Sequence, residues 1–187
     1  RAVEEELERG RTHVRFCVEL YRMQLAEKKH FVHERPARSK AWQMKEIMEI
    51  LMDPAVGMIE LDMCAFGMVS QGEAGEGLVK KTTRVMSASE DVLRRLDRRC
   101  RNHDAQEEDG HRHVHLIQGR AKRAQIYPRK LIEDICKGLS MQKKLDALGM
   151  RSRPVMTIEE MTAVGQCDGG CPSEAVHESE AKGFVAY

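Results

Sequence analysis

Residues 80–139 read KKTTRVMS (80–87), SEDVLRRLDRRC (89–100) and, after a polar loop, HRHVHLIQGRAKRAQIYPRKLIEDICKGL (111–139). The first segment has the composition of a strand. The second has apolar residues at helical spacing. The third joins a short strand-like run to a helix that opens at Tyr127-Pro128, where proline suits the first helical position. This alternation of strand and helix predicts an α/β fold with a central sheet.

The rest of the chain continues the alternation. Helical periodicity covers residues 3–29 and 41–52, and three glycines within residues 71–77 predict a loop. Four strands are expected to join one sheet with flanking helices, near residues 31–34, 57–63, 78–86 and 113–117. Residues 1–149 therefore form the predicted domain, and residues 150–187, rich in Gly, Ser and Glu, are predicted to be a disordered linker.

Composition limits the class of protein. A hydrophobic share of 41% can support a core, and no run of about 18 apolar residues is present, so neither a membrane span nor a membrane partner is expected. The six cysteines are dispersed and no secretory signal accompanies them, which favours reduced thiols and an intracellular place, cytoplasmic or nuclear. Because the first residue is Arg rather than Met, the chain is expected to be a fragment.

The formal net charge of +1 hides an asymmetry. Residues 80–130 hold 14 Lys and Arg against 7 Asp and Glu, a net of +7. A basic segment suits contacts with nucleic-acid phosphates, and a solvated charged face is the alternative. The residues predicted to contact nucleic acid are Lys80, Lys81, Arg84, Arg120, Lys122 and Arg123.

A series of short motifs resembles a known family. In order they are H-E-R-P (33–36), C-A-F-G (64–67), K-K-T (80–82), H-R-H-V-H-L-I-Q-G-R-A (111–121) and Y-P-R-K-L (127–131). The series resembles an internal segment of copia-type retrotransposon polyproteins, itself similar to the C-terminal half of DNA cytosine-5 methyltransferases. The resemblance implies a partial Rossmann-like, methyltransferase-like sheet. It also implies an accessory, non-catalytic, nucleic-acid-associated module whose partners are DNA or RNA backbones and other segments of the polyprotein.

An active methyltransferase fragment that uses S-adenosylmethionine is the alternative function. The resemblance gives Glu34, at the end of a predicted strand, the role of the glutamate that contacts the target base. Covalent attack on cytosine also needs a Pro-Cys nucleophile, and neither that pair nor a G-x-G-x-x-G cofactor loop occurs here. No cofactor and no methyl transfer by this chain alone are therefore expected, and polymerase and integrase motifs are absent from it as well.

A third hypothesis is a small zinc-stabilised interaction domain. It rests on Cys100, His103, His113 and His115, with His111 beside them, because cysteine and imidazole at the two ends of a loop can close a tetrahedral site. Alternate histidines on a strand share one face and do not easily wrap one ion. The side chains are therefore predicted to face apart and to hold no metal. The pair Cys167 and Cys171 with His177 is interpreted as part of the linker.

Overall fold

A three-stranded antiparallel sheet in the order β1-β5-β2 lies at the centre of the fold. The computed structural model describes residues 2–72, 75–100, 111–114, 116 and 126–150. Its elements are α1 (Ala2–Ala26), β1 (Val32–Pro36), η1 (Lys40–Gln43), α2 (Lys45–Leu51), β2 (Gly57–Asp62), η2 (Met63–Phe66), β3 (Val69–Gly72), β4 (Gly75–Leu78), β5 (Thr82–Ser87), α3 (Glu90–Leu96) and α4 (Arg129–Ala147).

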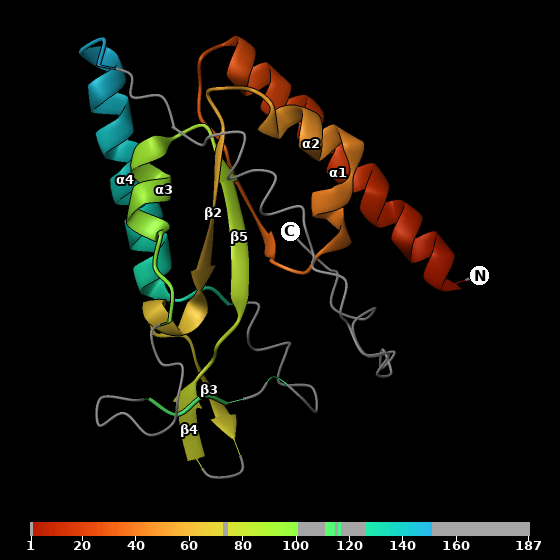
Figure 1. Ribbon diagram of the computed structural model, residues 1–187, viewed down its shortest axis with the longest axis vertical. Helices are drawn as coiled ribbons and strands as arrows, with labels where there is room; N and C mark the ends of the chain where they lie inside the picture. The colour runs from red at the N-terminus through yellow and green to blue at the C-terminus, as the bar shows by residue number, and fades with distance from the viewer. Residues whose placement is uncertain (1, 73–74, 101–110, 115, 117–125, 151–187) are drawn as a thin grey trace.

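Helices cover both faces of this sheet. Figure 1 shows α3 and α4 beside one face, α1 and α2 beside the other, and the hairpin β3–β4 extending from one end. Successive residues of a strand face opposite sides of a sheet. Val85 of β5 therefore packs into the core on the α3 side, while its neighbour Met86 packs into the core on the α1 side.

The core on the α3 side leads to the region where the candidate site forms. Its buried members come from β2, η2, β5, α3, α4 and the connections on either side of the hairpin β3–β4. They are Leu61, Met63, Phe66, Met68, Val79, Val85, Val92, Leu93, Leu96 and Leu131. Because η2 contributes two of these side chains, the short helix is fixed directly below the end of β2. Burial of this apolar surface is the main force that holds the turn in place.

The core on the α1 side is a separate cluster. It comprises Val14, Val18, Phe31, Trp42, Ile47, Ile50, Leu51, Val56 and Met86. The inward face of α1 repeats at helical spacing, with Val14 and Val18 both at most 1% exposed. The opposite face of α1 contributes nothing to this core.

A glycine permits the close approach of α3 and α4. A Cβ atom at Gly138 would lie 2.7 Å from the Cα of Val92 and 3.0 Å from the carbonyl oxygen of Asp91. Real Cβ atoms do not approach backbone so closely. The contact between the two helices therefore depends on a residue without a side chain at this position.

The glycine-rich segment predicted to be a loop forms the hairpin β3–β4, with Val69 opposite Leu78 and Gly72 opposite Gly75. Gly77 lets a further segment lie against it, since a Cβ atom there would come within 2.7 Å of Val114 Cγ2. His113 forms a parallel bridge with Leu78. The hairpin thus positions the histidine-containing segment.

The predicted mixture of helices and sheet is confirmed, but two finer expectations are not met. The described strands do not form the parallel sheet of a Rossmann-like domain, because β1 and β2 both pair antiparallel with β5. The four predicted strands also do not join one sheet, since residues 113–114 meet β4 in the second sheet instead. The predicted linker, residues 150–187, lies outside the described residues except for Met150.

Among the described residues, no helix is both long enough and apolar enough to cross a membrane.

Candidate metal centre

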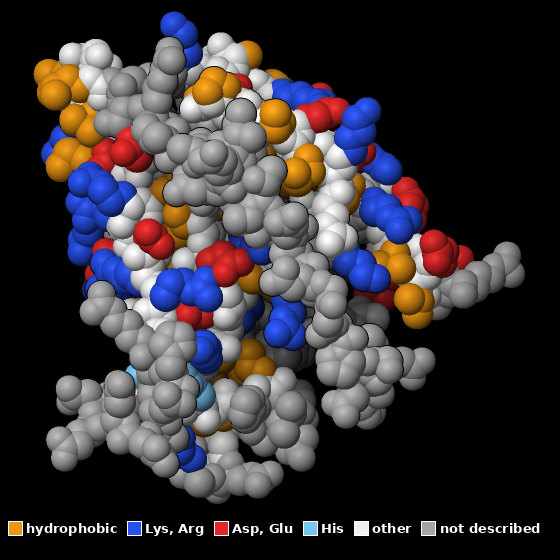
Figure 2. All heavy atoms as spheres, viewed as in Figure 1, with side chains coloured by type: hydrophobic (Ala, Val, Ile, Leu, Met, Phe, Trp, Pro, Cys, Tyr) orange, Lys and Arg blue, Asp and Glu red, His pale blue; other side chains and the backbone are white. Residues whose placement is uncertain are grey.

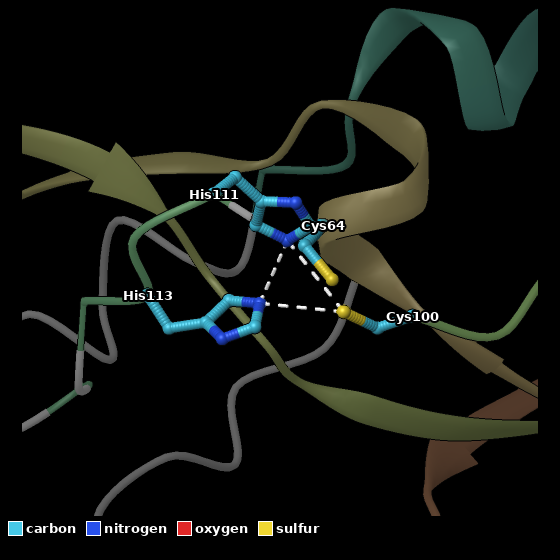
Figure 3. A group of neighbouring side chains, drawn as sticks. All are labelled: Cys64, Cys100, His111 and His113. Carbon is cyan, nitrogen blue, oxygen red and sulfur yellow. Dashed lines mark hydrogen bonds between the residues drawn. The ribbon is translucent and has the colours of Figure 1, made fainter. Parts of the chain in front are cut away.

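Two thiols and two imidazoles converge below the end of the central sheet. Figure 3 shows Cys64, Cys100, His111 and His113 pointing toward one another, and one ligand atom from each lies within 4.8 Å of all the others. The two cysteines are buried and the two histidines are half-buried. Three segments of the chain therefore meet at one point through thiol and imidazole atoms, which are the usual protein ligands of zinc.

Cys64 is positioned by η2, directly after β2. Met63 and Phe66 anchor this turn in the core. The Met63 amide donates to the Lys81 carbonyl oxygen at 3.1 Å, and the Gly67 amide donates to the Cys64 carbonyl oxygen at 3.0 Å. The Cys64 side chain is thus fixed by backbone bonds on both sides of it.

Asp62 holds Cys100 next to Cys64. Its amide donates to the Arg98 carbonyl oxygen at 3.0 Å, and its Oδ2 accepts from the Cys100 amide at 2.8 Å. Burial would raise the pKa of Asp62, but the hydrogen bonds from Thr82 and Cys100 and the charge of Arg99 lower this pKa overall. Hydrogen bonds from groups outside the ligand set commonly orient the ligands of metal sites, and Asp62 has this position relative to Cys100.

The backbone of residues 112–114 fixes the two histidines. The Leu78 amide donates to the Arg112 carbonyl oxygen at 3.1 Å, and the Val114 amide donates to the Leu78 carbonyl oxygen at 2.8 Å. The Arg112 guanidinium donates to the carbonyl oxygens of Gly75 and Glu76. Because side chains alternate along an extended segment, Arg112 faces the hairpin while both histidines face the cysteines.

The distances between the candidate ligand atoms fit tetrahedral coordination of one metal ion. Cys100 Sγ lies 3.5 Å from Nε2 of His111 and 3.5 Å from Nε2 of His113. Zinc bonded to one sulfur and one nitrogen at its usual distances places those atoms about 3.5 Å apart. The two Nε2 atoms are 2.8 Å apart, and a small rotation of either ring brings them to the separation of about 3.4 Å expected of two zinc-bound nitrogens.

The chemistry of the donor set favours zinc among the common metals. Two thiolates and two imidazoles form the ligand set of many structural zinc sites, whereas magnesium and calcium take oxygen ligands. Burial and the adjacent thiol of Cys100 raise the pKa of Cys64 to about 12. Metal binding deprotonates such thiols and releases protons.

The sequence predicted part of this site. Cys100 and His113 belong to it, as does the neighbouring His111, and the expectation that these side chains face apart is wrong. His103 and His115 lie outside the described residues, as do Cys167, Cys171 and His177. His111 and His113 face the cysteines because backbone pairing with β4 brings their segment across them.

Cys64 was missed by sequence reasoning. A cysteine two residues after a strand looks like any small buried apolar residue. The available signal was the ligand number, because a tetrahedral site with Cys100, His111 and His113 lacks one ligand and Cys64 supplies it.

Glu34 lies in the middle of β1, opposite Val85 of β5. Its Oε2 accepts a hydrogen bond from the Tyr127 hydroxyl, and its Oε1 is buried with no hydrogen-bond partner. Burial and the Glu34 carboxylate together raise the pKa of Tyr127. The structure does not bring Glu34 into the metal cluster.

The predicted nucleic-acid contacts divide into three groups. Lys80 is exposed and Lys81 is half-buried, on the connection between β4 and β5. Arg84 forms an ion pair within the fold, because its Nε donates a hydrogen bond to the Glu60 carboxylate at 2.8 Å. The other three residues, Arg120, Lys122 and Arg123, lie outside the described residues.

Comparison of this chain with protein-family models, with curated proteins and with solved structures found no significant match.

Proposed function

We propose that this chain is a zinc-stabilised, non-catalytic interaction domain. The observation that carries the proposal is the convergence of Cys64, Cys100, His111 and His113 within 4.8 Å. Four protein ligands complete a tetrahedral zinc shell, whereas a catalytic zinc keeps one position for water or substrate. The ligand set therefore supports a structural role for the metal.

The position of the cluster explains what the metal would stabilise. Zinc would join the turn after β2, the segment after α3 and the segment beside β4. These contacts close a long chain loop between Cys64 and Cys100 and a shorter one between Cys100 and His111. Closing such loops costs conformational entropy, which the binding free energy of the metal offsets. The hairpin is the part of the described fold that contributes least to the two cores and gains most from this link.

Metal content and thermal stability test this proposal together. Protein purified without a histidine tag is expected to hold one zinc per chain by elemental analysis. Because the metal binds the folded state, a strong chelator is expected to remove it and lower the melting temperature. Protein without zinc that melts identically with and without added zinc and chelator would contradict the proposal.

A second candidate is the accessory, nucleic-acid-associated segment of a retrotransposon polyprotein that the motif series implies. The position of Lys80 and Lys81 favours it, since they lie beside the metal centre and neither takes part in a salt bridge with the other described residues. Basic and acidic side chains are interspersed over much of the face shown in Figure 2, which argues against a broad contact surface for nucleic acid on that face. The lysine pair is therefore the part of the basic segment to test.

Replacing Lys80 and Lys81 with alanine is expected to weaken binding to DNA and RNA of every sequence alike. The slope of log affinity against log salt concentration is negative. If both lysines contact phosphates, the magnitude of this slope should decrease by about 2 in the double variant. Arg84→Ala is the matched control and should change the slope little, because Glu60 already holds that guanidinium. Fluorescence anisotropy over a salt series measures both effects. An unchanged slope in the double variant would favour a solvated charged face.

The methyltransferase alternative stays a prediction, with Glu34 as its one proposed catalytic residue. The Tyr127 hydroxyl occupies one oxygen of that carboxylate. The sequence has no Pro-Cys pair to form the covalent bond to cytosine. No transfer of methyl groups from S-adenosylmethionine to DNA by this chain alone is therefore expected.

A further inference from the structure

The outward face of α1 carries a seam of six exposed side chains. They are Arg9, His13, Phe16, Leu20, Met23 and Glu27. Glu27 follows directly after Ala26, the last residue of the helix. Their spacing alternates between four and three residues, which is the spacing of a coiled-coil contact line. Phe16 is 61% exposed and Met23 is 59% exposed. The seam therefore places apolar surface in water along the middle of a long helix.

The seam lies away from the rest of the fold. Val14 and Val18 point into the core on the opposite side of α1, and Arg15 and Arg22 reach α2 through Glu46 and Glu49. Figure 1 shows α1 along the outer edge of the molecule, with α2 on its inner side. Within the described fold, two polar side chains of the seam contact residues near them in the sequence, since Glu27 pairs with Lys29 and His13 contacts Cys17. No other described element covers the apolar residues of the seam, so a partner can reach them.

The order of residues along the seam is self-complementary. A second α1 can lie antiparallel against the seam, with the twofold axis at the level of position 18 along the helix. Phe16 then falls opposite the partner's Leu20, and His13 falls opposite the partner's Met23. Arg9 then falls opposite the partner's Glu27. Each end of the seam therefore pairs opposite charges, and the apolar residues meet in the middle. A parallel pair would instead set Arg9 against Arg9 and Glu27 against Glu27.

We propose that a second copy of this chain covers the seam and forms an antiparallel α1–α1 dimer. The charge order supports a second copy over an unrelated partner, because one helix carries both halves of the match. An interface related by a twofold axis uses the same surface on both subunits, and such dimers are the commonest oligomers. The proposal does not depend on the metal centre, since α1 contributes no ligand to it.

Charge reversal tests the pairing. Sedimentation equilibrium over a concentration series is expected to show a dimer for the natural chain. Arg9→Glu and Glu27→Arg should each raise the dissociation constant about tenfold or more, because each places two like-charge pairs in the dimer. The double variant carrying both changes should restore the natural value. Phe16→Glu combined with Leu20→Glu should leave a monomer.

Controls and outcomes are separable from folding. Glu4→Arg changes a charge on another side of α1 and should leave the dissociation constant unchanged. Circular dichroism and zinc content of each variant check that it is folded. A natural chain that stays monomeric up to about 1 mM, the weak limit of specific association, would overturn the proposal. So would a dimer that both single reversals leave intact, or one that the double reversal does not restore.

Discussion

Replacing Cys100 with serine is expected to prevent zinc binding and to lower the free energy of unfolding by about 4 kcal/mol. That figure corresponds to loss of a ligand present at roughly 1,000 times its dissociation constant. Serine offers no thiolate, so only three of the four ligands remain. Urea unfolding followed by circular dichroism, at a fixed concentration of free zinc, measures the difference between the natural and variant chains.

Cys136→Ser is the matched control for this variant. Cys136 is an exposed free cysteine on α4 and does not belong to the metal cluster. The same substitution there is expected to change the free energy of unfolding by less than about 0.5 kcal/mol, as surface changes usually do. If Cys100→Ser is no more destabilising than Cys136→Ser in the presence of zinc, Cys100 is not a ligand of a stabilising metal.

Replacing Gly138 with alanine is expected to destabilise the fold by about 1 kcal/mol net, because overpacking of the core costs about 2 kcal/mol. The new methyl group would meet the backbone of α3 at Val92 Cα, 2.7 Å away, and the helices would have to separate. This cost exceeds the gain of about 1 kcal/mol that alanine brings over glycine within a helix. Thermal unfolding of the zinc-loaded protein measures the net effect.

Gly10→Ala makes the same chemical change without the clash. Gly10 lies within α1, and a Cβ atom there meets nothing within 4 Å. Helix propensity alone then predicts stabilisation by roughly 0.5–1 kcal/mol. The two substitutions should therefore shift the melting temperature in opposite directions. An increase in both would mean that α3 and α4 do not pack as closely as described.

The sequence predicted the local elements well because they depend on local periodicity. The helix expected over residues 3–29 is α1 (Ala2–Ala26), and the strand expected over residues 57–63 is β2 (Gly57–Asp62). Apolar spacing of three and four, or of two, is enough for such predictions. The type of element follows from neighbours in the sequence.

Pairing and partners did not follow from local pattern. The antiparallel order β1-β5-β2 depends on contacts between segments far apart in the chain, such as Glu34 opposite Val85. The hairpin was not predicted, because its glycines are typical of a loop. In the structure, Gly77 leaves room for the side chain of Val114 to lie against the hairpin. Spacing around one loop gave three of the four candidate ligands, but Cys64 joins them only through η2 and Asp62.

The absorption spectrum of the cobalt(II)-loaded chain tests the metal centre most directly. Cobalt(II) can replace zinc in tetrahedral sites, and its absorption spectrum depends on the type and the number of its ligands. Two thiolates and two imidazoles predict strong visible bands of tetrahedral cobalt with thiolate charge-transfer absorption in the near ultraviolet. Cys64→Ser and Cys100→Ser should each change these bands, and Cys136→Ser should leave them intact. A weak, octahedral spectrum, or a tetrahedral spectrum that Cys64→Ser leaves unchanged, would contradict the site.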